Sequence, residues 1–174
     1  MKIKHNILTI VITIVTMLSL TGCEDTSRLG MLDKDDGVYK NNYFNFIVTQ
    51  KLNYTFTDNK DTTNIGNFEL RKLFELVDED TNDVVKGYYT DIKDSIDNTV
   101  KEFVSFEESK EGVTNQSGIF KNGEYLSVDF TNDSTSYRVS FKESKDYCLI
   151  FFMTYRSERD KIVRAKYTNY ICFK

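Results

Sequence analysis

The side chains that could take part in chemistry are few in kind. The 174-residue chain has three cysteines, Cys23, Cys148 and Cys172, and one histidine, His5, beside 27 acidic residues and 11 tyrosines. Thiolates and imidazoles are common nucleophiles and metal ligands, and carboxylates serve as general acids and bases. The positions of the cysteines and the histidine therefore decide much of the chemistry that is open to this protein.

Cys23 directly follows a segment that is typical of export signals. Lys2 and Lys4 make a basic start, and an apolar run extends over residues 7–20. These 14 residues are too few for a spanning helix, which needs about 20, but they match the apolar core of a secretory signal. The sequence therefore predicts export to the extracytoplasmic side of the membrane.

The end of that segment, Leu20-Thr21-Gly22-Cys23, resembles the lipobox of bacterial lipoproteins. The resemblance implies that the Cys23 thiol receives a diacylglyceryl group, that a signal peptidase cleaves between Gly22 and Cys23, and that acyl chains such as palmitate anchor the protein to the cell membrane. Two acyl chains suffice for stable anchoring, whereas one gives only marginal binding. The alternative is an ordinary secretory signal or an uncleaved anchor, with Cys23 unmodified.

Removal of residues 1–22 would change the functional constraints. The remaining 152 residues hold no histidine and carry a formal charge of −6, because Lys2, Lys4 and His5 are lost. An acidic surface is repelled by nucleic acid and by anionic lipid headgroups, so nucleic acid is not an expected partner. Without imidazole, Ser-His-Asp and Cys-His nucleophiles and the usual His-containing zinc sites are excluded. No cofactor or metal is expected.

Two acidic clusters and one pair of glycines are candidate binding sites. One cluster contains Asp33, Asp35 and Asp36, and the other contains Asp78, Asp80, Asn82 and Asp83. Neither has the bidentate Glu that closes a calcium-binding EF-hand loop, and solvated charges at loop tips are ordinary. The segment from Gly118 to Gly123 has the glycine spacing of a P-loop, but Glu124 stands where the Lys is needed, so a turn is expected.

Cys148 and Cys172 remain once Cys23 is lipidated. An even pair of cysteines outside the cytoplasm permits a disulfide, and two buried thiols acting as small apolar side chains are the alternative. A further set of side chains could rim a recognition surface or, alternatively, belong to the core and to the exposed start of a helix: Tyr88, Tyr89, Tyr155, Arg156 and Arg159.

Hydrophobic patterning predicts a single α+β domain over residues 37–174, joined to the lipid anchor by a flexible tether over 23–36. Strands are expected over residues 38–40, 43–48, 70–77, 84–90, 125–131, 136–142 and 147–153, with a loop over 51–66 and helix–strand ambiguity over 67–77. Helices are expected over residues 94–110, with Asp97 available for a capping box, and from Ser157 to about Ile171. The 147–153 run lacks alternation, which predicts a strand buried on both faces.

The segment Gly37-Val-Tyr-Lys-Asn-Asn-Tyr-Phe-Asn-Phe-Ile-Val is similar to the opening hairpin of Mog/PsbP-like lipoproteins of Gram-positive bacteria. The absence of proline also fits an AT-rich, low-GC Gram-positive genome. The resemblance implies an antiparallel β-sheet flanked by helices, an α/β/α sandwich, and no particular activity. Where that family has a Leu-Pro-x-x-Trp stretch, this chain has residues 49–54, with Tyr54 in the place of the Trp.

These features together predict a lipid-anchored extracytoplasmic domain that binds an unknown protein or small molecule and is not an enzyme. Two alternatives stay open. The first is a cell-envelope enzyme that hydrolyses glycans with two carboxylates about 5–9.5 Å apart. The second is a structural accessory subunit of a membrane complex.

The lipid assignment predicts that a Cys23→Ala variant loses its anchor. Cells grown with radiolabelled fatty acid should label the unaltered protein and leave the variant unlabelled, because alanine has no thiol to form the thioether. Equal labelling of both proteins would refute the assignment of Cys23.

Overall fold

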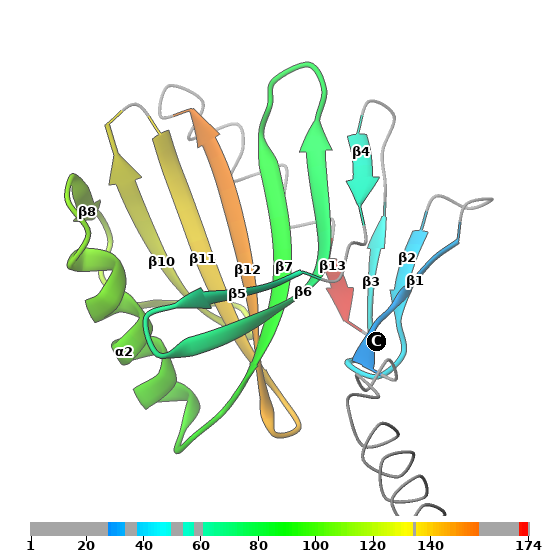
Figure 1. Cartoon of the computed structure of the whole chain (residues 1–174), viewed down its shortest axis with the longest axis horizontal. Coiled ribbons are helices and arrows are strands. Elements are labelled where there is room, and N and C mark those ends of the chain that lie inside the picture. Colours follow the sequence, from blue (N-terminus) through cyan, green and yellow to red (C-terminus); the bar gives the residue numbers. More distant parts are fainter. Residues whose placement is uncertain are drawn as a thin grey trace, which may run out of the picture.

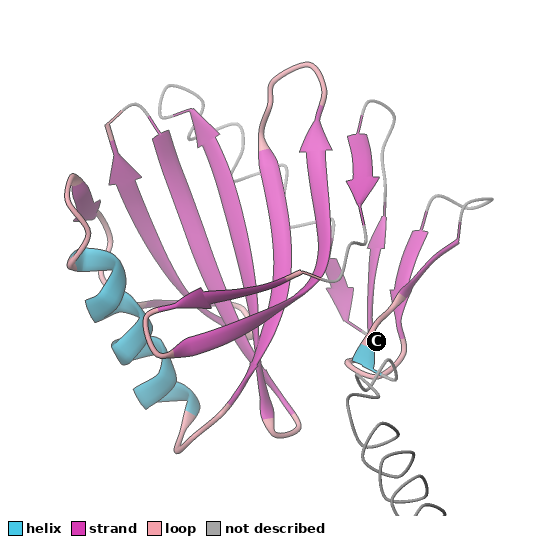
Figure 2. Ribbon diagram, in the orientation of Figure 1, coloured by secondary structure: helices cyan, strands magenta, loops and turns pink. Residues whose placement is uncertain are grey.

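The computed structural model describes residues 28–33, 38–49, 54–57, 61–133, 135–156 and 171–173, and within this part the chain forms two antiparallel sheets and one helix (Figure 1). Strands dominate these residues (Figure 2). No helix among them is long and apolar enough to cross a membrane. The bounds of the strands are β1 (Met31–Asp33), β2 (Val38–Asn41), β3 (Phe46–Thr49), β4 (Tyr54–Thr57), β5 (Thr62–Ile65), β6 (Phe68–Asp78), β7 (Val84–Asp91), β8 (Val113–Asn115), β9 (Phe120–Asn122), β10 (Tyr125–Asn132), β11 (Thr135–Ser144), β12 (Tyr147–Arg156) and β13 (Ile171–Phe173), and the helix is α2 (Ile96–Glu108).

The larger sheet has nine strands, and β12 lies near its centre. The strand order is β4-β6-β7-β12-β11-β10-β8, with β5 paired to β6 and β9 paired to β10. The apolar core has two clusters, one on each face of this sheet. Along β12 the side chains of Cys148 and Ile150 belong to the cluster beneath α2, whereas those of Leu149 and Phe151 belong to the cluster between the two sheets. The expectation that this strand is buried on both faces is confirmed.

A bulge in β6 allows this one strand to contribute apolar side chains to both core clusters. The register with β7 shifts between Lys72 and Phe74. Because side chains alternate along a strand, one extra residue exchanges the faces. Leu70 therefore lies in the cluster beneath α2, and Leu76, also at an even position, lies in the opposite cluster. This exchange explains why neither a helical nor a strand period fitted residues 67–77 throughout.

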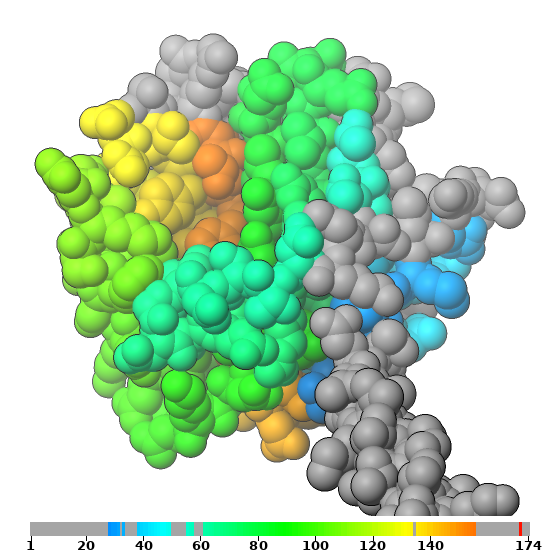
Figure 3. Space-filling view, viewed as in Figure 1, coloured from blue at the N-terminus to red at the C-terminus, as the bar shows by residue number. Residues whose placement is uncertain are grey.

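Helix α2 covers one face of the larger sheet. Val100, Phe103 and Val104 pack onto Val128, Val139 and other residues of the sheet. The helix begins at an N-cap, Ser95, whose side chain accepts a hydrogen bond from the backbone N–H of Asn98. The expected capping-box role of Asp97 is wrong, because the third helical residue is Asn98. In the space-filling view, β5 and the start of β6 lie on the same face as α2 (Figure 3).

The last turn of α2 is fixed by a buried carboxylate. The hydroxyl of Tyr137 donates to Glu107 Oε2 at 2.9 Å, and Lys110 Nζ lies 2.5 Å from Glu107 Oε1. Burial, reinforced by the Glu107 carboxylate, raises the pKa of Tyr137. A phenol that stays protonated keeps donating to Glu107, so this contact supports the helix at neutral pH.

Among the described residues, the opposite face of the larger sheet is covered by a second sheet and not by a helix. Its strand order is β1-β2-β3-β13, and Tyr39, Phe46 and Val48 pack against Phe74, Phe151 and their neighbours in the larger sheet. The expected α+β sandwich with helices on both faces is therefore wrong for the described residues, which are mostly β. The physical reason is that short alternating strands at both ends of the chain pair with each other and supply the same apolar cover.

Several local expectations also need correction. The segment 51–66, expected to be a loop, contains β4 and β5, and residues 31–33, inside the expected tether, form β1. The first turn lies at residues 42–45, with Asn45 at φ 59°, and not at Asn41 and Asn42. Residues 157–170 of the expected final helix lie outside the described residues, and Ile171 begins a strand.

Close contact between Phe74 and Gly87 generates a stability prediction. The two residues are directly opposite in the β6–β7 register, and a Cβ built on Gly87 would lie 2.3 Å from Phe74 Cε1. A Gly87→Ala change should therefore cost about 1–3 kcal/mol of unfolding free energy, as overpacked core substitutions do. Urea denaturation measures this cost.

Two further variants control that measurement. Thr63→Ala, at an exposed strand position, should change the unfolding free energy by less than about 0.5 kcal/mol. Adding Phe74→Leu to Gly87→Ala should cost less than the sum of the two single changes, because the smaller side chain leaves room for the new methyl group. A Gly87→Ala protein as stable as the parent would contradict this account of the packing.

Candidate functional site

The face of β10 and β11 that points away from α2 carries polar side chains. In each strand, alternate residues such as Val128 and Val139 enter the core beneath α2, so Asp129 and Arg138 must point to the other face. These two residues are direct partners in the β10–β11 register, as are Ser127 and Ser140. The sheet register therefore places two polar pairs side by side.

Asp129 and Arg138 form a bidentate ion pair. Arg138 Nε donates to Asp129 Oδ1 at 2.7 Å, and Nη2 donates to Oδ2 at 2.9 Å. The side chains are 11% and 5% exposed for Arg138 and Asp129, respectively. The guanidinium also lies over the ring of Phe120, 5.2 Å from its centroid. A parallel two-bond pair of this kind fixes the plane of the guanidinium as well as neutralising its charge.

The edge of the sheet holds Asp129 in place through the backbone. The Asp129 N–H donates to Ser117 Oγ at 2.9 Å, and the Gln116 N–H donates to the Asp129 carbonyl at 2.8 Å. Beside the ion pair, the hydroxyls of Ser127 and Ser140 are hydrogen-bonded at 2.9 Å. We call these four side chains, Ser127, Asp129, Arg138 and Ser140, the polar wall; their positions are set by several elements.

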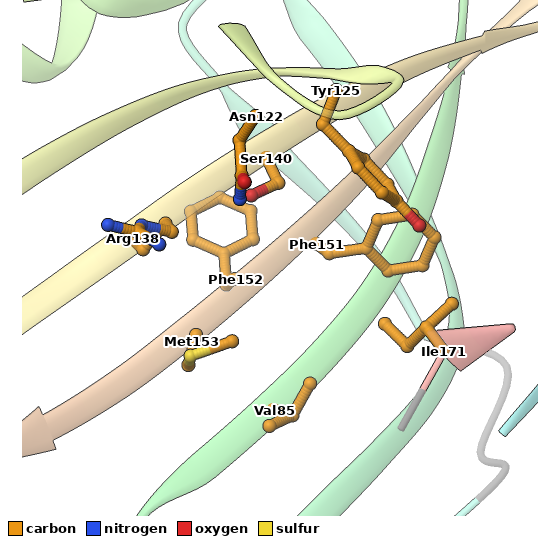
Figure 4. A pocket seen from close by; sticks show the side chains of 9 residues that line it. All are labelled: Val85, Asn122, Tyr125, Arg138, Ser140, Phe151, Phe152, Met153 and Ile171. Carbon is orange, nitrogen blue, oxygen red and sulfur yellow. The ribbon is translucent and has the colours of Figure 1, made fainter. Parts of the chain in front are cut away.

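A pocket opens beside this wall, with a cavity volume of about 50 Å³ (Figure 4). Most of its surface is apolar, and its polar groups come from β9, β10 and β11. The lining residues are Val85, Asn122, Tyr125, Arg138, Ser140, Phe151, Phe152, Met153 and Ile171. Figure 4 shows Arg138, Asn122 and Ser140 toward one side of the pocket and Ile171 and Val85 toward the other. Strands of both sheets therefore contribute to one small binding surface.

The composition of the lining limits the chemistry that this pocket can support. The described residues that line it include no carboxylate, lysine or thiol, and the one charged side chain among them, Arg138, is paired with Asp129. A glycosidase-type mechanism needs two carboxyl groups that face the same bond. The pocket instead suits a ligand with an apolar body and a hydrogen-bond acceptor, held without covalent chemistry.

The cysteines singled out from the sequence are only partly described. Cys23 and Gly22 lie outside the described residues, so lipidation and cleavage stay predictions. The Cys148 side chain is fully buried in the core beneath α2, and burial raises the pKa of its thiol. The Cys172 side chain is outside the described part, although its backbone lies in β13. The Cys148–Cys172 disulfide stays a prediction.

The acidic cluster at the β6–β7 turn is organised by its own backbone. Asp78 is buried, and its Oδ1 accepts hydrogen bonds from the N–H groups of Asp80 and Thr81. Asp80 is exposed, whereas Asp83 is buried. Among the described residues, no three His, Cys, Asp or Glu side chains are grouped so that they could hold a metal ion. In the other acidic cluster Asp33 pairs with Lys40, and Asp35 and Asp36 lie outside the described residues.

Two other sequence candidates have structural roles. Gly118 and Gly123 have positive φ angles and flank the short strand β9, so the expectation of one turn over residues 118–123 is wrong. A turn lies at Gly123 and Glu124, and strand β10 follows it where a P-loop would require a helix. Tyr89 and Tyr155 are buried in the core between the sheets, and Tyr88 packs beneath α2. The side chains of Arg156 and Arg159 lie outside the described part.

Sequence reasoning missed the Asp129–Arg138 pair. In the strand expected over residues 136–142, alternation puts Val139 and Phe141 on one face and Arg138 and Ser140 on the other. A positive side chain on β11 and a negative one on β10, both opposite an apolar stripe, is a signal that could have suggested the pair once the register was known.

The ion pair predicts strong energetic coupling between its members. Arg138→Met or Asp129→Leu alone should each lower the unfolding free energy by about 3–5 kcal/mol, because each leaves an uncompensated buried charge. The double variant should lose much less unfolding free energy than the sum of the losses in the two single variants. Chemical denaturation of the four proteins measures the coupling.

A matched control lies on the same strand. Lys142 pairs with Glu124, whose side chain is 75% exposed, so Lys142→Met should cost no more than about 1 kcal/mol. Additive losses in the Asp129 and Arg138 variants would mean that the pair is not coupled as its geometry requires.

Comparison with known proteins identifies a similar fold. No protein-family model matches this chain, and no curated protein matches its sequence. Among solved structures, cyanobacterial PsbP (CyanoP) from Synechocystis sp. PCC 6803 is similar with a TM-score of 0.54 and 9% sequence identity. The match covers 90% of this chain and 99% of the CyanoP chain. The chain therefore has a PsbP-like fold, as the opening hairpin suggested, and a likeness at this identity concerns the fold alone.

Proposed function

We propose that this protein is a lipid-anchored, extracytoplasmic accessory domain that binds a partner protein through the pocket beside Arg138 and does not catalyse a reaction. The anchor is the lipid on Cys23, and the cell membrane is its location. The PsbP-like fold is compatible with this role but does not carry the proposal, since one fold serves many functions.

The observation that carries the proposal is the pocket itself. It combines an apolar lining from Val85, Phe151 and Met153 with a rigid polar wall whose charges cancel. A site of this kind binds by shape and hydrogen bonding, because it lacks the paired acid and base that hydrolysis needs. The lining therefore gives no support to glycan hydrolysis.

The size of the pocket favours a side chain over a whole metabolite. Ligand sites for small molecules commonly measure about 300–1,000 Å³. The cavity here is about 50 Å³, enough for a few water molecules or for the end of one aliphatic side chain. Anchor side chains seated in such pockets dominate the energy of many protein interfaces. We therefore assign the pocket to an aliphatic side chain of a partner protein.

Arg138 provides the polar part of this recognition. A guanidinium has five N–H groups, and two of those of Arg138 face Asp129. The other three point away from the carboxylate. A backbone carbonyl of the partner, next to the inserted side chain, would accept from them, and the Asp129 charge would disfavour a carboxylate at the same place.

A pair of variants at Ser140 tests this proposal. Ser140→Phe should fill the pocket and reduce the amount of partner that co-purifies after mild detergent extraction by at least tenfold. Ser140→Ala should leave that amount within about twofold, because it removes only the hydroxyl that pairs with Ser127. The readout is the stoichiometry of one membrane protein, cross-linked in cells and quantified by mass spectrometry.

The outcomes separate the alternatives. If both variants retain a stoichiometric partner, the interface lies outside the pocket. The accessory role would then stand, but the assignment of the pocket would be refuted. The repeated absence of any partner, with both variants folded, would sink the binding function. Glycan cleavage by the purified protein would establish the enzymatic alternative instead.

A further inference from the structure

Residues that follow the lipid anchor are attached to the folded domain. The guanidinium of Arg28 stacks on Tyr147, with its Cζ 4.7 Å from the ring centroid, and lies 5.9 Å from the centroid of Tyr43. Cation–π contacts of this kind contribute about 0.5–1 kcal/mol when exposed and more when desolvated. Leu29 adds an apolar contact to the core between the sheets. Arg28, the first described residue, is therefore already in contact with the folded domain.

Hydrogen bonds fix the backbone at the same place. Asn41 Nδ2 donates to the Arg28 carbonyl at 3.0 Å, and the Gly30 N–H donates to Tyr39 Oη at 3.0 Å. A Cβ on Gly30 would lie 2.3 Å from Tyr39 Cζ and 2.6 Å from the Lys40 carbonyl oxygen. Because a backbone carbonyl cannot move aside, only glycine fits at this position.

Strand pairing continues the attachment along residues 31–33. Met31, Leu32 and Asp33 pair antiparallel with β2, and Asp33 Oδ2 lies 3.0 Å from Lys40 Nζ. We name residues 28–33, held by these contacts, the clamp. Six of the 14 residues of the expected tether are therefore attached to the domain, and three of them, Met31–Asp33, form a strand of the small sheet.

The clamp shortens the distance that the anchor can span. From Cys23 to Arg28 there are five residue steps, which reach at most about 18 Å when fully extended. Without the clamp, the free chain would extend to Val38, and its 15 steps would reach about 54 Å. The clamp therefore removes about two thirds of the available reach.

We propose that the clamp holds the domain against the membrane in one orientation, with the turns at residues 42–45 and 145–146 facing the lipid surface. This inference rests on the proposed lipidation of Cys23. Lys145 Nζ lies 3.5 Å from the centroid of the Tyr43 ring, so the two turns and Arg28 form one end of the domain. The β6–β7 turn at residues 79–83 and the β10–β11 turn lie at the opposite end (Figure 1).

Tether length, more than charge, sets this orientation. The membrane-facing end carries Arg28 and Lys145, but Asp91 and Asp146 lie nearby, since Tyr147 pairs with Asp91 and the Ile92 N–H donates to the Asp146 carbonyl. Mixed charges of this kind give little attraction to anionic lipid. The distal end carries Glu79 and Asp80, which adds repulsion from such a surface.

Energy transfer from the two ends of the domain to the membrane tests the orientation. The full chain, lipidated in cells, would carry a donor dye on a clickable amino acid at exposed Asn42 or exposed Asp80, in vesicles that contain acceptor-labelled lipid. Transfer from position 42 should be at least twice that from position 80, since a strand of eight residues such as β7 separates the ends by about 26 Å.

Variants of the clamp should abolish this difference. Arg28→Ala combined with Gly30→Ala should bring transfer from the two positions within about 20% of each other, because the released domain can turn. Arg28→Lys retains a cation for Tyr147 and should keep the difference, as should Lys121→Ala, a matched loss of one exposed charge elsewhere. Thermal melting checks that each variant is folded.

Flotation of the same vesicles separates the two proposals. Equal transfer from both ends of a protein that floats with the vesicles would overturn the orientation and leave the anchor intact. A difference that persists in the double variant would show that the clamp is not its cause. A protein that does not float lacks the lipid anchor, and both proposals then fall.

Discussion

The fold depends on one strand, β12, that must be buried on both of its faces. Its uninterrupted apolar segment leaves no side that can meet water, so each face of the larger sheet needs a cover. Helix α2 provides one cover, and the small sheet of β1, β2, β3 and β13 provides the other. The bulge in β6 follows from the same constraint, because it lets one long strand contribute apolar side chains first to one layer and then to the other.

Local patterns predicted the strands better than the layers. The alternation of Val128 and Phe130, and of Val139 and Phe141, correctly gave β10 and β11 and a buried face on each, and the helix expected over residues 94–110 correctly placed α2. In the small sheet, the hairpin strands β2 and β3 were expected, but β1 and β13 were not, because each has only three residues and β13 pairs with β3 across most of the chain. Such pairings carry no local period, so a helix was expected where this sheet lies.

The candidate site was out of reach for a related reason. An isolated Arg138 on an exposed-looking position of a strand suggests solvent contact, and only the register with β10 brings Asp129 opposite it. The pocket then requires a third element, since Ile171 comes from the other sheet. Sites assembled from separate segments depend on tertiary packing, whereas the resemblance of residues 20–23 to a lipobox is contiguous and needs only the sequence.

Small size need not make the proposed pocket ineffective at a membrane. One buried aliphatic side chain supplies about 1.5–3 kcal/mol, which is far below the energy of a stable complex in solution. If the partner is held in the same bilayer, however, association becomes effectively intramolecular, and short tethers give effective concentrations in the millimolar range. A short anchor strengthens this effect, because it restricts both the distance and the direction that the pocket can sample. The clamp at Arg28 and the pocket at Arg138 would then act together. Weak contacts in the pocket would suffice for binding, because the clamp already limits the distances and directions at which the pocket can meet the partner.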